Sequence, residues 1–224
     1  MTTQYFKLLV ITLVISLASC NKDKGVVFTD YKYADKLEKI SCGDTDTKLL
    51  NEALYAFEED VTKHYKTQNG NMTRAYSRFI RESIAGRLKF EDVISKHTLE
   101  VFEALKKDQT LWNLGGTKSN LNYNSDIINC IGENIKNNHL KSVFNSLKSI
   151  NSLSPKLFGE PLKTSSGMLL NDKYLATYVA LEFYYAKLFD IDLTNINFQE
   201  TATNIDFNKI PREQQTVPNT DTTN

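Results

Sequence analysis

The sequence predicts an all-α protein: a single irregular helical bundle of six or seven helices, followed by a disordered C-terminal tail. The chain has 224 residues but only four prolines and nine glycines, so residues that interrupt helices are sparse. Apolar residues recur at helical spacing through most of the chain, and no segment has a convincing strand pattern. Hydrophobic residues make up 41% and charged residues 24%, a balance that is typical of a globular domain.

The first half of the chain predicts four helices. Thr29 is placed to cap a short helix that extends to residue 40, and Asp44, Thr45 and Asp46 supply a cap and first-turn carboxylates for a longer one. A turn over residues 68–71 and a break near Gly86 separate three long helices. Their apolar stripes are Leu50, Ala53, Leu54, Phe57, Val61 and Tyr65; Met72, Ala75, Tyr76, Phe79, Ile80 and Ile84; and Phe90, Val93, Ile94, His97, Val101, Phe102 and Leu105.

The second half begins with a loop over residues 108–124, with the lone Trp112 tucked beneath it. Helical spacing returns over residues 127–135 and 140–150, with a joint at Asn137 and Asn138. Residues 151–167 contain two prolines and two glycines and predict a long irregular connection. The last helix, over residues 169–189 with Asn171 or Asp172 as its cap, is apolar nearly all round and should be the central, buried helix.

The first twenty residues, MTTQYFKLLVITLVISLASC, have the pattern of an export signal. Lys7 precedes an apolar run over residues 8–18, which ends at small residues. The run is too short for a membrane span, which needs about 20 apolar residues. Leu17-Ala18-Ser19-Cys20 resembles the lipobox of bacterial lipoproteins. The resemblance implies that the chain is cut before Cys20 and that this cysteine carries the lipid, including palmitate-type acyl chains.

The resemblance also implies a location. Asn21, rather than Asp, follows the acylated cysteine, which implies sorting to the outer membrane of a Gram-negative cell; whether the domain faces the periplasm or the exterior stays open. Residues 21–27 would form a tether of about 20 Å. The expected organisation is a signal peptide over 1–19, the lipidated cysteine and tether over 20–28, an all-α domain over 29–200 and a disordered polar tail over 201–224.

The two remaining cysteines form an even pair if Cys20 is acylated. In an oxidising compartment, Cys42 and Cys130 are expected to form a disulfide. The bond would close a loop of about 89 residues and contribute roughly 4–5 kcal/mol in the chain-entropy model. The alternative is two buried free thiols.

No sequence motif indicates a metal, a cofactor or a nucleic acid as a ligand. The chain has 27 residues of each charge and a formal net charge of zero, whereas nucleic-acid-binding domains usually have a basic surface. Neither Cys42 nor Cys130 has a Cys or His at ligand spacing, and no histidine has the Glu three residues earlier that a di-iron bundle uses. We therefore expect no metal site and no cofactor.

Weak catalytic candidates are Glu59, His64 and His97. Asp60 and His64 lie one helical turn apart, where a carboxylate can orient an imidazole for acid–base work. The simpler interpretation is a surface pair for His64 and a hydrogen-bonded core histidine for His97.

Two further sets of residues suggest binding surfaces. Arg74, Arg78 and Arg81 form a basic ridge on one helix, which would either complement the acidic helix before it or face an acidic partner or lipid headgroups. A group of aromatic residues in the last helix would either line a pocket for an apolar or carbohydrate ligand or pack in the core: Tyr174, Tyr178, Tyr184 and Tyr185.

The leading functional hypothesis is a lipid-anchored helical binding or scaffold module in the cell envelope. It would act through contacts with an envelope protein and without catalytic chemistry. The alternatives are an anchored hydrolase of envelope polymers that uses carboxylates and a histidine, and an inhibitor or immunity-type lipoprotein that caps a secreted toxin.

Overall fold

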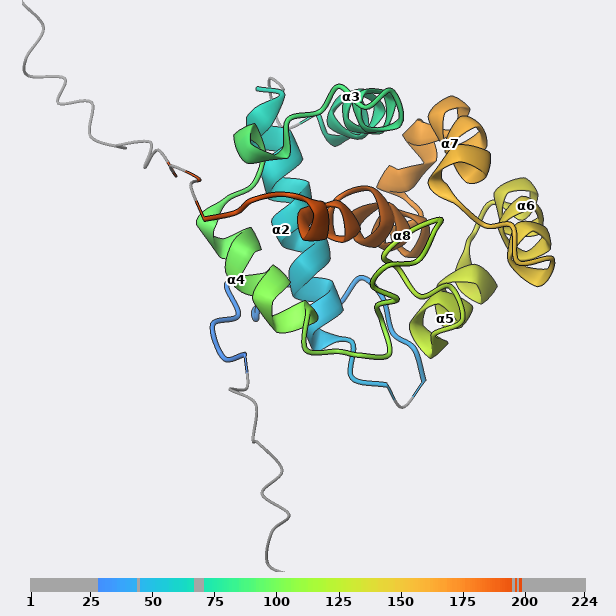
Figure 1. Ribbon diagram of the computed structural model, residues 1–224, viewed down its shortest axis with the longest axis horizontal. Helices are drawn as coiled ribbons and strands as arrows, with labels where there is room; N and C mark the ends of the chain where they lie inside the picture. The colour runs from blue at the N-terminus through green and yellow to red at the C-terminus, as the bar shows by residue number, and fades with distance from the viewer. Residues whose placement is uncertain (1–27, 44, 67–70, 195, 197, 199–224) are drawn as a thin grey trace, which may run out of the picture.

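The computed structural model describes residues 28–43, 45–66, 71–194, 196 and 198, and within these residues the protein is an all-α bundle without a sheet (Figure 1). The α-helices are α2 Lys48–His64, α3 Met72–Ile84, α4 Lys96–Leu105, α5 Asp126–Asn134, α6 Asn138–Ser149, α7 Pro155–Thr164 and α8 Lys173–Phe183. The 3₁₀ helices are η2 Phe90–Asp92, η3 Ser166–Leu170 and η4 Tyr185–Asp190. The predicted fold class is confirmed.

Helix α8 lies at the centre of the bundle, as its apolar sequence predicts. It packs against α2 and α3 on one side and α5 on the other (Figure 1), and every residue from Leu175 to Phe183 is buried. The Asp172 side chain caps it by accepting a hydrogen bond from the Leu175 N–H at 3.1 Å. The prediction of one continuous helix over 169–189 is wrong, because η3 precedes α8 and the chain leaves the helical conformation at Tyr184 before η4.

Helices α3, α4 and α6 begin at polar side-chain caps, whereas Thr47 at the start of α2 makes no side-chain cap hydrogen bond. Asn71, Ser95 and Asn137 accept hydrogen bonds from backbone N–H groups at the starts of α3, α4 and α6. The predicted break near Gly86 is confirmed, since this residue has a φ of +64° just after α3. The third predicted helix starts later than expected, at Lys96, because residues 90–92 form only a 3₁₀ turn.

The short helix expected over residues 29–40 is absent: this segment forms turns and irregular structure. Side chains from α2 bind the backbone groups that a helix would satisfy internally. Asn51 accepts hydrogen bonds from the N–H groups of Lys39 and Ile40, and Glu52 accepts one from the N–H of Tyr33. Tertiary hydrogen bonds therefore replace the local helix.

Helix α7 occupies the stretch that was expected to be an irregular connection. Ser154 caps it, and Pro155 occupies its first turn, where a missing N–H has no cost. Pro161 lies inside the helix, and Gly159 lets its backbone approach the side chain of Ile84 on α3. The prolines and glycines of this stretch therefore serve a helix that is packed closely against α3.

Cys42 and Cys130 are joined by a disulfide, with their Cα atoms 5.8 Å apart. The bond connects the segment before α2 to α5, and Tyr174 of α8 supports the same junction by donating a hydrogen bond to the carbonyl of Ser41 at 2.9 Å.

The expected loop around Trp112 also packs inward, because the indole N–H donates to the Leu105 carbonyl at 2.7 Å.

Several expectations lie outside the described residues: the signal peptide, Cys20, the tether over 21–27, most of the turn over 68–71, Asp44 and the tail over 201–224. Among the helices that are described, none is both long and apolar enough to cross a bilayer.

Candidate functional site

Helix α2 carries three carboxylates that are almost fully buried, Glu52, Glu58 and Asp60. Glu58 accepts hydrogen bonds from the ammonium of Lys173 and the hydroxyl of Tyr76, both at 2.6 Å. Glu58 and Asp60 bind side chains within the bundle, and these contacts hold α2 against its neighbours. Glu52 differs because its partner is an imidazole, His97, whose other ring nitrogen faces two further carboxylates.

The Asp60 carboxylate joins α2 to the start of α4 and to Tyr184. It accepts hydrogen bonds from the hydroxyls of Thr98 and Tyr184 and from the N–H of Ser95, which fixes the start of α4. Burial raises the pKa of the Asp60 carboxyl, although these hydrogen bonds oppose the shift. Asp60 therefore does not orient His64, as the sequence spacing had suggested.

Glu52 is bound to His97. The Nε2 atom of His97 lies 2.7 Å from Oε1 of Glu52, and the two side chains are 13% and 2% exposed. Glu52 also accepts the N–H of Tyr33, and the Tyr33 ring packs edge-on against the imidazole with the centroids 5.7 Å apart. The imidazole is thus fixed on one side by a buried carboxylate and on its face by an aromatic ring.

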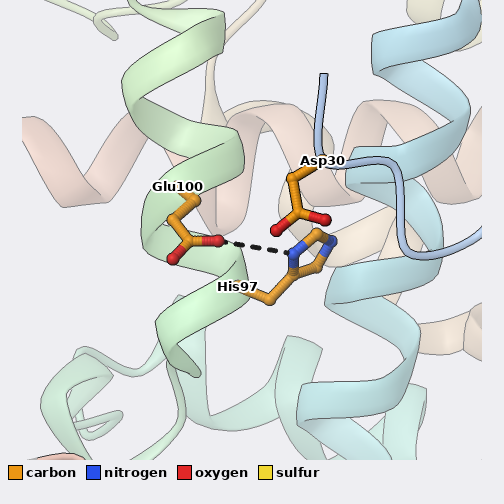
Figure 2. A group of neighbouring side chains, drawn as sticks. All are labelled: Asp30, His97 and Glu100. Atoms are coloured by element: carbon orange, nitrogen blue, oxygen red, sulfur yellow. Dashed lines mark ion pairs between the residues drawn. The ribbon is translucent and has the colours of Figure 1, made fainter. Parts of the chain in front are cut away.

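The other ring nitrogen of His97 faces two more carboxylates (Figure 2). Nδ1 lies 3.8 Å from Oε2 of Glu100, which is one turn further along α4, and Asp30 reaches the same place from the segment that precedes α2. One ligand atom from each of the three residues lies within 4.8 Å of the others. Asp30 and Glu100 also line a shallow surface hollow together with Phe28, Thr29, Glu103, Ala104 and Lys107.

The three weak catalytic candidates do not form one site. Glu59 and His97 both contact Tyr33, but His64 lies 12 residues beyond Glu52 on α2, about 18 Å along the helix axis, and its Nδ1 contacts the carbonyl of Asp92. Partial burial alone would raise the pKa of Glu59. Hydrogen bonds from two lysines and Tyr33 outweigh that effect and lower the pKa to about 2.

Three of the four tyrosines proposed to line a pocket are core residues. Tyr178, Tyr184 and Tyr185 are fully buried, whereas Tyr174 lies nearer the surface at the junction with Ser41. These three side chains therefore pack in the hydrophobic core, as the second interpretation of the sequence expected.

The basic ridge of Arg74, Arg78 and Arg81 is exposed on α3. Its contacts in the described structure lie on α3 itself and on Tyr65: Arg78 is 3.8 Å from Glu82 and stacks on the Tyr65 ring, and Arg81 donates to Ser77. Among the described residues, no ion pair joins the carboxylates of α2 to these arginines.

None of the carboxylates around His97 was predicted from the sequence as its partner, although the spacing of one of them, Glu100, could have indicated it. Glu100 follows His97 at i, i+3, so a shared helix face was visible. Asp30 and Glu52 are far from His97 in sequence, and only the fold brings them together. Comparison with family models, curated proteins and solved structures gives no match.

Proposed function

We propose that this protein is a lipid-anchored binding module of the bacterial cell envelope. The observation that carries the proposal is the sequence Leu17-Ala18-Ser19-Cys20 at the end of an apolar export signal. In this account Cys20 becomes the first residue of the mature chain and carries the lipid, and the helical domain is held at the membrane surface.

Two features support export and close attachment. The Cys42–Cys130 disulfide suits an oxidising compartment, in which such bonds persist. Only seven residues separate Cys20 from Phe28, where the described structure begins, and they span at most about 25 Å when extended. A domain on so short a tether has one end turned toward the bilayer.

The arginine ridge is the surface that we assign to a partner. The first described segment lies beside the lower end of α4 in Figure 1, whereas α3 lies at the upper edge of the molecule. If the tether attaches the lower end to the membrane, α3, the helix that carries Arg74, Arg78 and Arg81, lies at the opposite end of the molecule. This arrangement favours an acidic protein partner over the headgroups of the same membrane.

The anchoring is tested by fractionating cells that express Cys20→Ala. We expect this variant to be uncleaved and unlipidated and to leave the membrane fraction. The matched control is Cys42→Ala/Cys130→Ala, which removes the other two cysteines and should stay membrane-bound. A Cys20→Ala protein that remains in the membrane fraction without lipid would refute the anchor.

The binding surface is tested by crosslinking in intact cells. We expect the wild-type protein to form a specific adduct that the triple variant Arg74→Glu/Arg78→Glu/Arg81→Glu loses. Lys96→Glu/Lys156→Glu, which reverses charge at two other exposed positions, is the control and should retain the adduct. Identical adducts in both variants would exclude the ridge as the contact surface.

A further inference from the structure

The fixed orientation of His97 leaves one of its nitrogens available to a ligand. A carboxylate only accepts hydrogen bonds, so the 2.7 Å contact between Glu52 and Nε2 requires the proton to be on Nε2. In the neutral imidazole Nδ1 then carries the lone pair, and Nδ1 is the atom that faces Asp30 and Glu100 (Figure 2). At metal sites a carboxylate commonly accepts a hydrogen bond from the histidine nitrogen that does not bind the metal.

We propose that Asp30, His97 and Glu100 bind a divalent transition-metal ion, with Glu52 orienting the imidazole. The three ligand atoms lie within 4.8 Å of one another, and those of His97 and Glu100 are 3.8 Å apart. Ligands of a tetrahedral zinc ion at about 2.0–2.1 Å are about 3.3 Å apart. The separation of the His97 and Glu100 ligand atoms must therefore shorten by about 0.5 Å, and that of any pair by no more than about 1.5 Å, when the ion binds.

The side chains that must move are the ones that are free to do so. Asp30 is exposed and the Glu100 side chain is 41% exposed, whereas His97 and Glu52 are held in the bundle. One imidazole nitrogen with two carboxylate oxygens suits zinc or manganese, whereas calcium and magnesium prefer ligand sets made of oxygen alone. Three protein ligands would leave a fourth position open toward the adjoining hollow.

The ion would connect parts of the chain that are distant in sequence. Asp30 lies in the irregular segment before α2, and His97 and Glu100 lie on α4. A bound metal would therefore fasten this segment to the bundle ten residues after Cys20. If Cys20 carries the lipid, as proposed above, the ion would also stabilise the segment next to the tether. The metal site itself does not depend on the lipid anchor.

The test is zinc titration calorimetry on the full chain, purified in a non-ionic detergent through a tag without histidine. We expect one zinc ion per chain. Asp30→Asn and Glu100→Gln each remove one ligand but keep the His97–Glu52 contact, and each should weaken zinc binding at least about tenfold. Cobalt absorption should show the same order of affinities.

Two controls separate this site from general surface binding. Glu103→Gln changes a neighbouring carboxylate of the same hollow, and His139→Gln removes an exposed histidine elsewhere. Both should bind zinc within about twofold of the wild-type affinity, given that neither residue is a ligand. No zinc binding by the wild-type chain, or equal affinity in the wild type, Asp30→Asn and Glu100→Gln, would overturn the proposal. In that case the cluster would be a hydrogen-bonded contact between α4, Glu52 and the segment before α2.

Discussion

Replacing Glu182 by glutamine should make the protein more stable, and increasingly so as the pH rises. Glu182 is on the central helix α8, its carboxylate is fully buried, and neither oxygen has a hydrogen-bond partner of normal geometry among the described residues. The hydroxyls of Tyr123 and Tyr178 beside it are also unpartnered there. Burial raises the pKa of Glu182 to about 7, and the nearby Ser119, Tyr123 and Lys187 oppose this only in part.

The size of the effect follows from the two protonation states. The ordinary value of 4.5 applies to the unfolded chain and about 7 to the folded one, so between these pH values the folded protein keeps a proton that the unfolded chain has lost. The contribution of Glu182 to the free energy of unfolding is therefore most favourable below about pH 4.5, and it is lost as the pH rises through 7. A difference from 4.5 to about 7 corresponds to about 3 kcal/mol in the free energy of unfolding.

Urea unfolding between pH 4 and 8 measures this effect, with the fluorescence of the buried Trp112 as the probe. The stability of Glu182→Gln minus that of the wild type should rise by about 3 kcal/mol over this range. Other carboxyl groups cancel in the difference. Glu160→Gln, at an exposed position, should show no such rise. Parallel pH profiles for Glu182→Gln and the wild type would refute the reasoning.

Two other changes have predictable effects on stability. Cys42→Ser/Cys130→Ser removes a crosslink between positions 88 residues apart and should lower the free energy of unfolding by about 4–5 kcal/mol. Urea unfolding measures the loss, with the oxidised and reduced wild type as the comparison. A loss below about 1 kcal/mol would contradict the chain-entropy explanation. Lys173→Met leaves the buried Glu58 without its 2.6 Å ion-pair partner and should lower the free energy of unfolding by about 3 kcal/mol. The double variant Glu58→Gln/Lys173→Met should recover most of that loss. Equal losses in the single and double variants would show that the two residues are not coupled.

Helix periodicity and capping residues were sufficient to predict most of the bundle. Asp172 caps α8, as predicted, and Asn71 and Asn137, which were predicted only as turn and joint residues, cap α3 and α6. Helix α7 was missed because Pro155 and Pro161 were interpreted as breaks, although the first is favourable in an initial turn. The segment before α2 was wrongly predicted as a helix because the side chains that bind its backbone come from α2.

The candidate site was less accessible to prediction from sequence. His97 was one of the weak catalytic candidates in the sequence, and Glu52, Asp30 and Glu100 converge on it in the structure. Two of them are remote in sequence, so no local spacing could identify them. Glu182 was missed for a related reason: on an apolar helix one carboxylate gives no indication of whether it faces solvent or the core.

Mass spectrometry of the N-terminal peptide from membrane-fraction protein tests the central claim most directly. The account predicts a tryptic peptide that begins at Cys20 and is heavier than its unmodified mass by a diacylglyceryl group, with or without a further acyl chain. A peptide that begins at Met1, or an unmodified Cys20 in protein that is still membrane-bound, would contradict the lipid anchor.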